Sequence, residues 1–268
     1  MQSHSLKGFA YLTVAISSFL ALMVFGCSSS LELSSTWTNQ EIVITGDGSR
    51  WKDATTSISG PDVSVGVKND NNNLYVCLIT SNRATQLQML GLGCTAWFDT
   101  EGKKNKTFGI QFPVSGLLQG RRFPTRDNPE ELQRLINAAQ RQLVICGPAD
   151  GEEHRMSVQD GQGVEAHLGY ADGTLTYELK VSLQKNNEHP YAINAAMTQP
   201  LLLGFETGNL AEAMKGRPDV SNRSQVTSVR GRPGGGAGSG AGSGLGSEMP
   251  EPLKHWITVH LSSGSAAK

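Results

Sequence analysis

Apolar and polar residues alternate along much of this chain, and a period of two is typical of β-strands that bury one face. Residues 63–67 alternate Val with Ser and Gly, whereas residues 74–80 are apolar on both faces, which predicts a central strand. The run of Asn and Asp at 69–73 predicts a tight turn, because these residues tolerate left-handed backbone. The pattern indicates two neighbouring antiparallel strands.

The same reasoning predicts strands in several other parts of the chain. Residues 94–99 place Cys94, Ala96 and Phe98 on one face and Thr95, Trp97 and Asp99 on the other. Residues 164–183 form a predicted hairpin, since Asp-Gly at 172–173 is a strong turn signal. The remaining predicted strands are 41–45, 86–92 (a weak pattern), 108–112, 201–207 and 255–261.

Two helices are predicted at the periphery of these strands. Asn128, Pro129 and two acids form a helix start, and apolar residues follow at helical spacing to Leu143, beyond which the chain turns extended. A shorter helix is predicted over 209–215, ended by a glycine. The fold class is therefore all-β: a jelly-roll-like β-sandwich with one or two peripheral helices.

The domain boundaries follow from composition. Residues 1–26 read as a signal peptide, 27–36 as a Ser-rich flexible tether, and 37–262 as one β-sandwich domain. Residues 231–247 consist almost wholly of Gly, Ser and Ala, which cannot bury apolar surface, and predict a disordered loop before the last strand.

The first 27 residues resemble the lipobox of bacterial lipoproteins. An apolar run of roughly 15 residues is short for a spanning helix but fits a signal peptide. It ends in Val24-Phe25-Gly26-Cys27, and Val24 stands where the family usually has Leu. The resemblance implies acylation of Cys27, cleavage before it, and a membrane lipid as partner. Ser28 is not Asp, which by enterobacterial sorting rules indicates the outer membrane. The alternative is an ordinary secretory signal with an incidental cysteine.

The net charge bears on the binding partner, and the cysteines bear on possible disulfides. Removal of residues 1–26 takes away one Lys and leaves 22 basic and 24 acidic side chains, so nothing favours nucleic acid. Besides Cys27, the chain has Cys77, Cys94 and Cys146. In an oxidising compartment the best disulfide pair is Cys77 with Cys94, and the alternative is three buried thiols.

One family matches the order of motifs over residues 37–113. The opening block contains Trp37, a Gly-Asp-Gly turn and Trp51, and the later blocks read NLYVCLIT and AWFDTEGKK. This order resembles the sandwiches similar to carbohydrate-binding module family nine, within the broader DOMON-like group. The resemblance implies the β-sandwich and, for the sugar-binding members, two Trp side chains that clamp a saccharide.

Few residues qualify as candidates for a functional site. Trp97, Trp51 and Trp256 are candidates for a stacking platform, since a flat ring matches the apolar face of a sugar, and Asp99 lies beside Trp97. The competing interpretation is core packing. Asp99 and Glu101 are weak calcium candidates, although a carboxylate that caps the turn explains Asp99 equally well. No other cofactor is expected.

The sequence contains no motif of a known catalytic centre, so an enzyme is not expected. The leading hypothesis is an envelope lipoprotein with a non-enzymatic binding domain whose ligand is a carbohydrate. The alternative is a structural lipoprotein that binds an envelope protein and no small molecule. A minor alternative is an accessory module of a carbohydrate-processing system.

Overall fold

We describe the protein from a computed structural model of residues 1–268. The description covers residues 31–59, 62–114, 129–147, 152–209 and 251–264. The predicted signal peptide, lipidated Cys27, the 209–215 helix beyond its first residue and the 231–247 loop lie outside these ranges.

The first sheet has seven strands in the order β1-β13-β12-β6-β7-β8-β9. All neighbours pair antiparallel except β1 and β13, which are parallel. The strands are β1 (Leu31–Ser34), β6 (Cys94–Asp99), β7 (Phe108–Gln111), β8 (Gln142–Cys146), β9 (Glu153–Ser157), β12 (Leu201–Thr207) and β13 (Lys254–His260). We call it sheet A.

The second sheet, sheet B, has the order β10-β11-β5-β4-β2, with β3 also paired to β4. Its strands are β2 (Thr36–Trp37), β3 (Thr55–Ser57), β4 (Val63–Asn69), β5 (Asn73–Thr80), β10 (Val164–Ala171) and β11 (Thr174–Ser182). The β10–β11 hairpin turns at Asp172 and Gly173, both with positive φ, as the Asp-Gly signal predicts.

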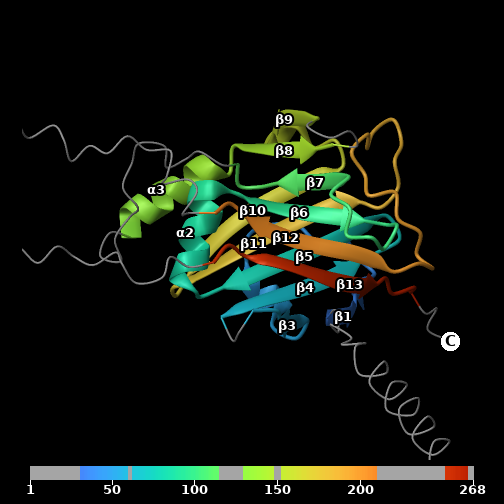
Figure 1. Cartoon of the computed structure of the whole chain (residues 1–268), viewed down its shortest axis with the longest axis horizontal. Helices are drawn as coiled ribbons and strands as arrows, with labels where there is room; N and C mark the ends of the chain where they lie inside the picture. Colours follow the sequence, from blue (N-terminus) through green and yellow to red (C-terminus); the bar gives the residue numbers. More distant parts are fainter. Residues whose placement is uncertain (1–30, 60–61, 115–128, 148–151, 210–250, 265–268) are drawn as a thin grey trace, which may run out of the picture. The chain divides into compact units, whose positions relative to one another are not determined.

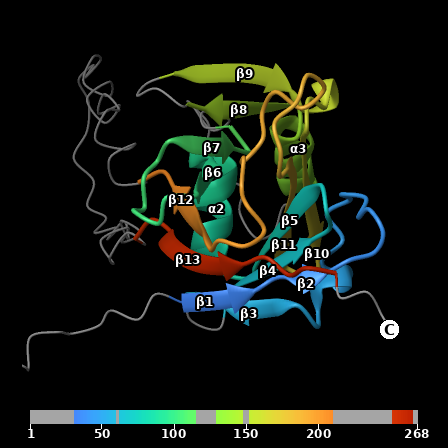
Figure 2. The ribbon, with the colours of Figure 1, turned by 90° about the vertical axis from the view of Figure 1, so that its right-hand side faces the viewer.

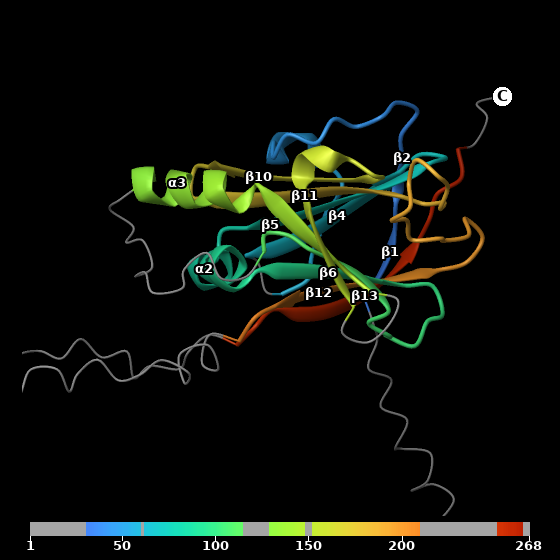
Figure 3. The same ribbon diagram turned by 90° about the horizontal axis from the view of Figure 1, so that it is seen from above.

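The two sheets face each other across one hydrophobic core, and Figure 3 shows them as two layers. The inward residues alternate along each strand, so Cys94, Ala96 and Phe98 of β6 meet Val76 and Leu78 of β5 in the same cluster. The predicted fold class, an all-β sandwich with peripheral helices, is confirmed.

Two α-helices lie at the same end of the sandwich (Figure 1). α2 (Arg83–Leu92) links sheet B to sheet A, and α3 (Pro129–Ala139) precedes β8. Short 3-10 turns cover Gly48–Trp51 (η1) and Val158–Asp160 (η2). Helix α3 agrees with the predicted helix start.

Three sequence-based expectations were wrong. Residues 86–92 are helical and not extended, because Asn82 caps the helix by accepting from the Thr85 amide at 3.0 Å. Residues 31–37, predicted largely as flexible tether, form β1 and β2. Residues 41–45 form no strand; side-chain contacts described below hold them on sheet B instead.

The chain passes from one sheet to the other at Ser35, and Figure 2 shows β1 and β2 consecutively along the side where β13 approaches β4. Asn69, fully buried at the end of β4, binds both crossing segments. Its Oδ1 accepts from the Ser35 hydroxyl and from the Ser262 amide at 3.1 Å, and its Nδ2 donates to the Ser262 carbonyl at 3.0 Å. One amide side chain therefore joins the β1–β2 crossing and the segment after β13 to the end of β4.

We expect Asn69→Ala to lower the free energy of unfolding by about 2–3 kcal/mol, because it leaves several buried polar groups without partners. Asn71→Ala, in the exposed turn beyond β4, is the matched control and should change it by less than about 0.5 kcal/mol. Denaturant unfolding of both variants measures the difference. Equal stability of the two variants would show that the Asn69 contacts contribute nothing.

Candidate functional site

Trp51 is removed from the candidate binding residues, because it is fully buried. Its ring packs on Gly66, and its Nε1 donates to Oε1 of Glu178 at 2.6 Å. Glu178 is itself fully buried and also accepts from the backbone amides of Thr45, at 2.8 Å, and Gly46. These bonds fix residues 41–51 on the outer face of sheet B, so Trp51 serves packing.

Asp99 is 1% exposed and caps the turn that follows β6. Its carboxylate accepts from the backbone amides of Glu101, Lys103 and Asn105 at 2.7, 2.8 and 2.9 Å. Burial acts to raise the pKa of Asp99, but the backbone hydrogen bonds outweigh it and the net pKa is lowered. The geometry favours the turn-capping interpretation over ligand binding.

Trp256 lies on the outer face of sheet A, opposite Gly204 in the neighbouring strand β12. A Cβ atom added to Gly204 would meet three central ring atoms, Cδ2, Cε2 and Cε3, each at 2.9 Å. Equal distances of this kind mean that the indole lies face down over the glycine. One face of the ring packs on the strand, and the side chain is only partly buried.

Trp97, in β6, has the same arrangement over the neighbouring strand β7. It stands opposite both Gly204 in β12 and Gly109 in β7, and a Cβ at Gly109 would lie 2.5 Å from its Cε3. The ammonium group of Lys106 lies 5.7 Å from the ring centroid and also pairs with Glu206. The Trp97 Nε1 is buried and has no partner among the described residues.

The register therefore produces one row across sheet A: Gly109, Trp97, Gly204 and Trp256. We call it the tryptophan row. Trp97 and Trp256 stand two strands apart, which corresponds to about 9.5 Å from the strand spacing. Each ring lies over a glycine of the next strand in the same direction, so the two rings keep this separation. Polar side chains of Lys254, Thr258 and Gln111 project from the same face.

The disulfide between Cys77 and Cys94 is not formed, since both residues are buried free thiols. Cys77 lies on the outer face of sheet B with Trp51 and Tyr75, whereas Cys94 belongs to the core between the sheets. Burial raises the pKa of the Cys94 thiol to about 12, and that of Cys146, with Glu153 adding to the effect, to about 11. Cys77 and Cys94 pack as small hydrophobic groups, whereas Cys146 is partly exposed.

The glycines of the tryptophan row and Lys106 were missed by the sequence reasoning. Alternation along 94–99 places Trp97 outward, but the pairing of Trp97 with Trp256 depends on β12 lying between them. Gly109 and Gly204 are single glycines inside predicted strands, which is a signal for close approach of another group.

Comparison with solved structures finds likeness to a carbohydrate-binding module of family 9 from Caldicellulosiruptor kristjanssonii. Its complex with glucose is 8% identical over 66% of this chain and 78% of that chain, with a TM-score of 0.33. Its complex with cellotriose is 8% identical over 68% and 77%, with a TM-score of 0.31. At these values the likeness carries no argument about a ligand. No family model matches the chain, and no curated protein matches it.

Within the described ranges, no group of three or more His, Cys, Asp or Glu side chains is placed to hold a metal ion. Glu101, the second calcium candidate, pairs with Lys103 at 3.1 Å. No helix in the same ranges is long and apolar enough to cross a membrane.

We expect Asp99→Ala to destabilise the protein by about 2 kcal/mol at pH 7, because the charged acceptor of three backbone amides is lost. The folded pKa lies below the unfolded value of about 3.9, so this stabilisation is complete above that value and disappears as pH falls through the folded pKa. Chemical unfolding at pH 7 and pH 3 measures it, with exposed Asp53→Ala as control. A difference between wild type and Asp99→Ala that grows at pH 3 would contradict the assignment.

Proposed function

We propose that this chain is a lipid-anchored envelope protein whose β-sandwich binds a glycan through the tryptophan row and catalyses no reaction. The observation that carries the proposal is the placement of Trp256, whose ring lies flat on Gly204. A flat indole held parallel to the sheet presents one apolar face outward, which is the complement of the apolar face of a pyranose ring. The glycine beneath it is what permits this orientation.

Polar groups beside the rings supply the directional contacts. Lys254, Thr258 and Glu206 flank Trp256 on the same face and can hydrogen-bond to sugar hydroxyls. At Trp97, the Lys106–Glu206 ion pair is held at the ring and is surface exposed, with side chains 41% and 29% exposed, so a bound sugar can exchange hydrogen bonds with it at small cost. The spacing of about 9.5 Å lets successive parts of one glycan chain contact both rings.

The protein-partner alternative is less favoured by the surface. A broad exposed apolar patch is a common mark of a protein interface. In the described part of the chain, Val43, in the 41–51 segment, is the sole large hydrophobic side chain that is mostly exposed. One such side chain does not make a broad apolar patch. The buried acids Glu178 and Asp99 each accept three hydrogen bonds from the protein itself, which supports binding over acid–base chemistry.

The anchor is the second part of the proposal and rests on the sequence of residues 1–27. Because β1 begins at Leu31, only Ser28, Ser29 and Ser30 separate Cys27 from the folded body. Three residues reach about 10 Å when fully extended. An acylated Cys27 would hold the sandwich directly at the surface of the membrane, by the sorting argument the outer membrane, without a long tether.

We expect Trp256→Ala to reduce the affinity for a glycan by about tenfold or more, equivalent to about 1.4 kcal/mol of lost stacking. Gly204→Ala should also weaken binding, because its Cβ displaces the ring without removing it. Array screening identifies the glycan, and calorimetry measures the affinities.

Trp37→Ala is the matched control for these two variants. Trp37 is also partly exposed but lies in sheet B, and its loss should leave the affinity unchanged. Failure of the unaltered protein to bind any glycan would refute the proposed ligand. Equal affinity of wild type and Trp256→Ala would refute the tryptophan row as its site.

The anchor is tested separately by metabolic labelling with a palmitate analogue. Wild-type protein should be labelled and recovered with membranes, whereas Cys27→Ala should be unlabelled, because the thiol is the acylation site of the lipobox. Cys146→Ala controls for acylation at another thiol. Persisting label in Cys27→Ala would sink the lipoprotein assignment and leave the binding site unaffected.

A further inference from the structure

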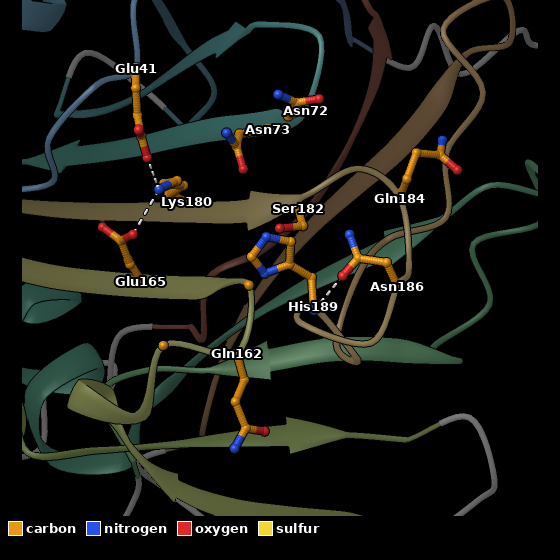
Figure 4. A pocket seen from close by; sticks show the side chains of 12 residues that line it. Glu41, Asn72, Asn73, Gln162, Glu165, Lys180, Ser182, Gln184, Asn186 and His189 are labelled. Carbon is orange, nitrogen blue, oxygen red and sulfur yellow. Dashed lines mark hydrogen bonds and ion pairs between the residues drawn. The ribbon is translucent and has the colours of Figure 1, made fainter.

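A pocket of about 500 Å³ lies on the outer side of sheet B, away from the tryptophan row. Figure 4 shows its walls: the segment carrying Glu41, the turn at Asn72, the loop at Gln162, the end of β11, and the loop that bears His189. Five separate chain segments converge there, and the volume lies within the usual range for small-ligand sites, about 300–1,000 Å³.

Every side chain that lines this pocket is polar or charged. Typical ligand pockets are lined mainly by apolar and aromatic groups, with few polar ones. Asn72, Gln162 and Ser182 offer amide and hydroxyl groups that can both donate and accept, and Ser182 is only 4% exposed. Such a lining suits a ligand that carries many hydrogen-bonding groups, such as the hydroxyls of a sugar.

The pocket is pre-organised by local contacts. Asn186 Oδ1 accepts from the backbone amides of Glu188 and His189 at 2.8 and 2.7 Å, so its NH₂ group stays available. Gly163, with φ of +88°, lies so close that a Cβ there would be 2.8 Å from the His189 Cβ and 3.0 Å from the Ser182 Oγ. His189 Nδ1 has no hydrogen-bond partner among the described residues.

The charges at one side of the pocket sum to minus one. Lys180 lies between Glu41 and Glu165, with its Nζ 2.7 Å from Glu165 Oε1. Burial acts to lower the pKa of Lys180, but the hydrogen bonds to Glu165 and Glu41 outweigh it and the net pKa is raised, so the ammonium group stays charged at neutral pH. The carboxylates are 48% and 63% exposed, whereas Lys180 is 12% exposed. A ligand therefore meets the carboxylates more readily than the ammonium.

We propose that this pocket binds a single sugar unit carrying an amino group. The ring hydroxyls would bond to the amides and Ser182, and the ammonium group would pair with the outward oxygens of Glu41 and Glu165. A uronic acid or a phosphorylated sugar would be repelled by the same carboxylates. The inference rests on the pocket alone and does not depend on the tryptophan row.

Ligand-observed NMR titration of the purified full chain with glucosamine, glucose and glucuronate tests the proposal. Glucosamine should bind saturably, glucose at least about threefold more weakly, and glucuronate weakest. A difference of about threefold in affinity is what an exposed ion pair contributes. Glu165→Gln should reduce the glucosamine-over-glucose preference about threefold, and His189→Ala should weaken all three sugars.

Two comparisons keep the outcome decisive. Trp256→Ala, which removes any sugar bound at the tryptophan row, should keep the preference for glucosamine over glucose and glucuronate, and thermal melting of each variant verifies that it is folded. Absence of glucosamine binding by the folded wild type overturns the proposal, as does a preference for glucuronate. A glucosamine preference that Glu165→Gln leaves unchanged overturns it as well.

Discussion

The buried carboxyl group of Glu178 determines how the outer face of sheet B is covered. Three donors from residues 45–51 converge on it, including the indole of Trp51. A buried carboxyl group is costly unless its oxygens are hydrogen-bonded, so residues 45–51 must lie across sheet B for β11 to be stable. The crossing is close: Gly46 lies against Gly169, where a Cβ on Gly169 would be 2.0 Å from the Gly46 carbonyl oxygen. The same segment carries Glu41 to Lys180, and so builds one wall of the polar pocket.

Sheet A is organised differently, by glycines instead of a buried carboxyl group. Gly109 and Gly204 leave space above their strands, and the Trp97 and Trp256 rings occupy it. On sheet B a tryptophan also covers a glycine, Gly66, but Trp51 is fully buried under its own segment. A tryptophan packed over a glycine is therefore a buried packing residue on sheet B and part of a partly exposed aromatic row on sheet A. What differs is whether a further segment covers the ring.

Local signals in the sequence were sufficient for much of the sandwich. The alternation in 94–99 gives the inward and outward faces of β6, and Asp172-Gly173 gives the β10–β11 hairpin, because side-chain period and turn chemistry are local properties. Residues 31–37 and 41–45 were misjudged because tertiary partners decide them. β1 and β2 depend on β13 and β4, more than 200 and about 30 residues away, and the 41–45 segment depends on Glu178. The site has the same limit: Trp97 was found from its strand, but its pairing with Trp256 and the glycines below the rings require the register of four strands, β7, β6, β12 and β13.

The most direct test of glycan binding on sheet A is a ¹H–¹⁵N NMR titration with a glycan that the array identifies. It follows the Nε1–H signals of the four tryptophans. The Trp256 and Trp97 signals should shift progressively, because these rings form the tryptophan row. The signal of Trp51, bonded to Glu178 in the interior, and that of Trp37, bonded to Asn39 at the edge of sheet B, should stay in place. Shifts confined to Trp37, or no indole shift at saturating glycan, would contradict it.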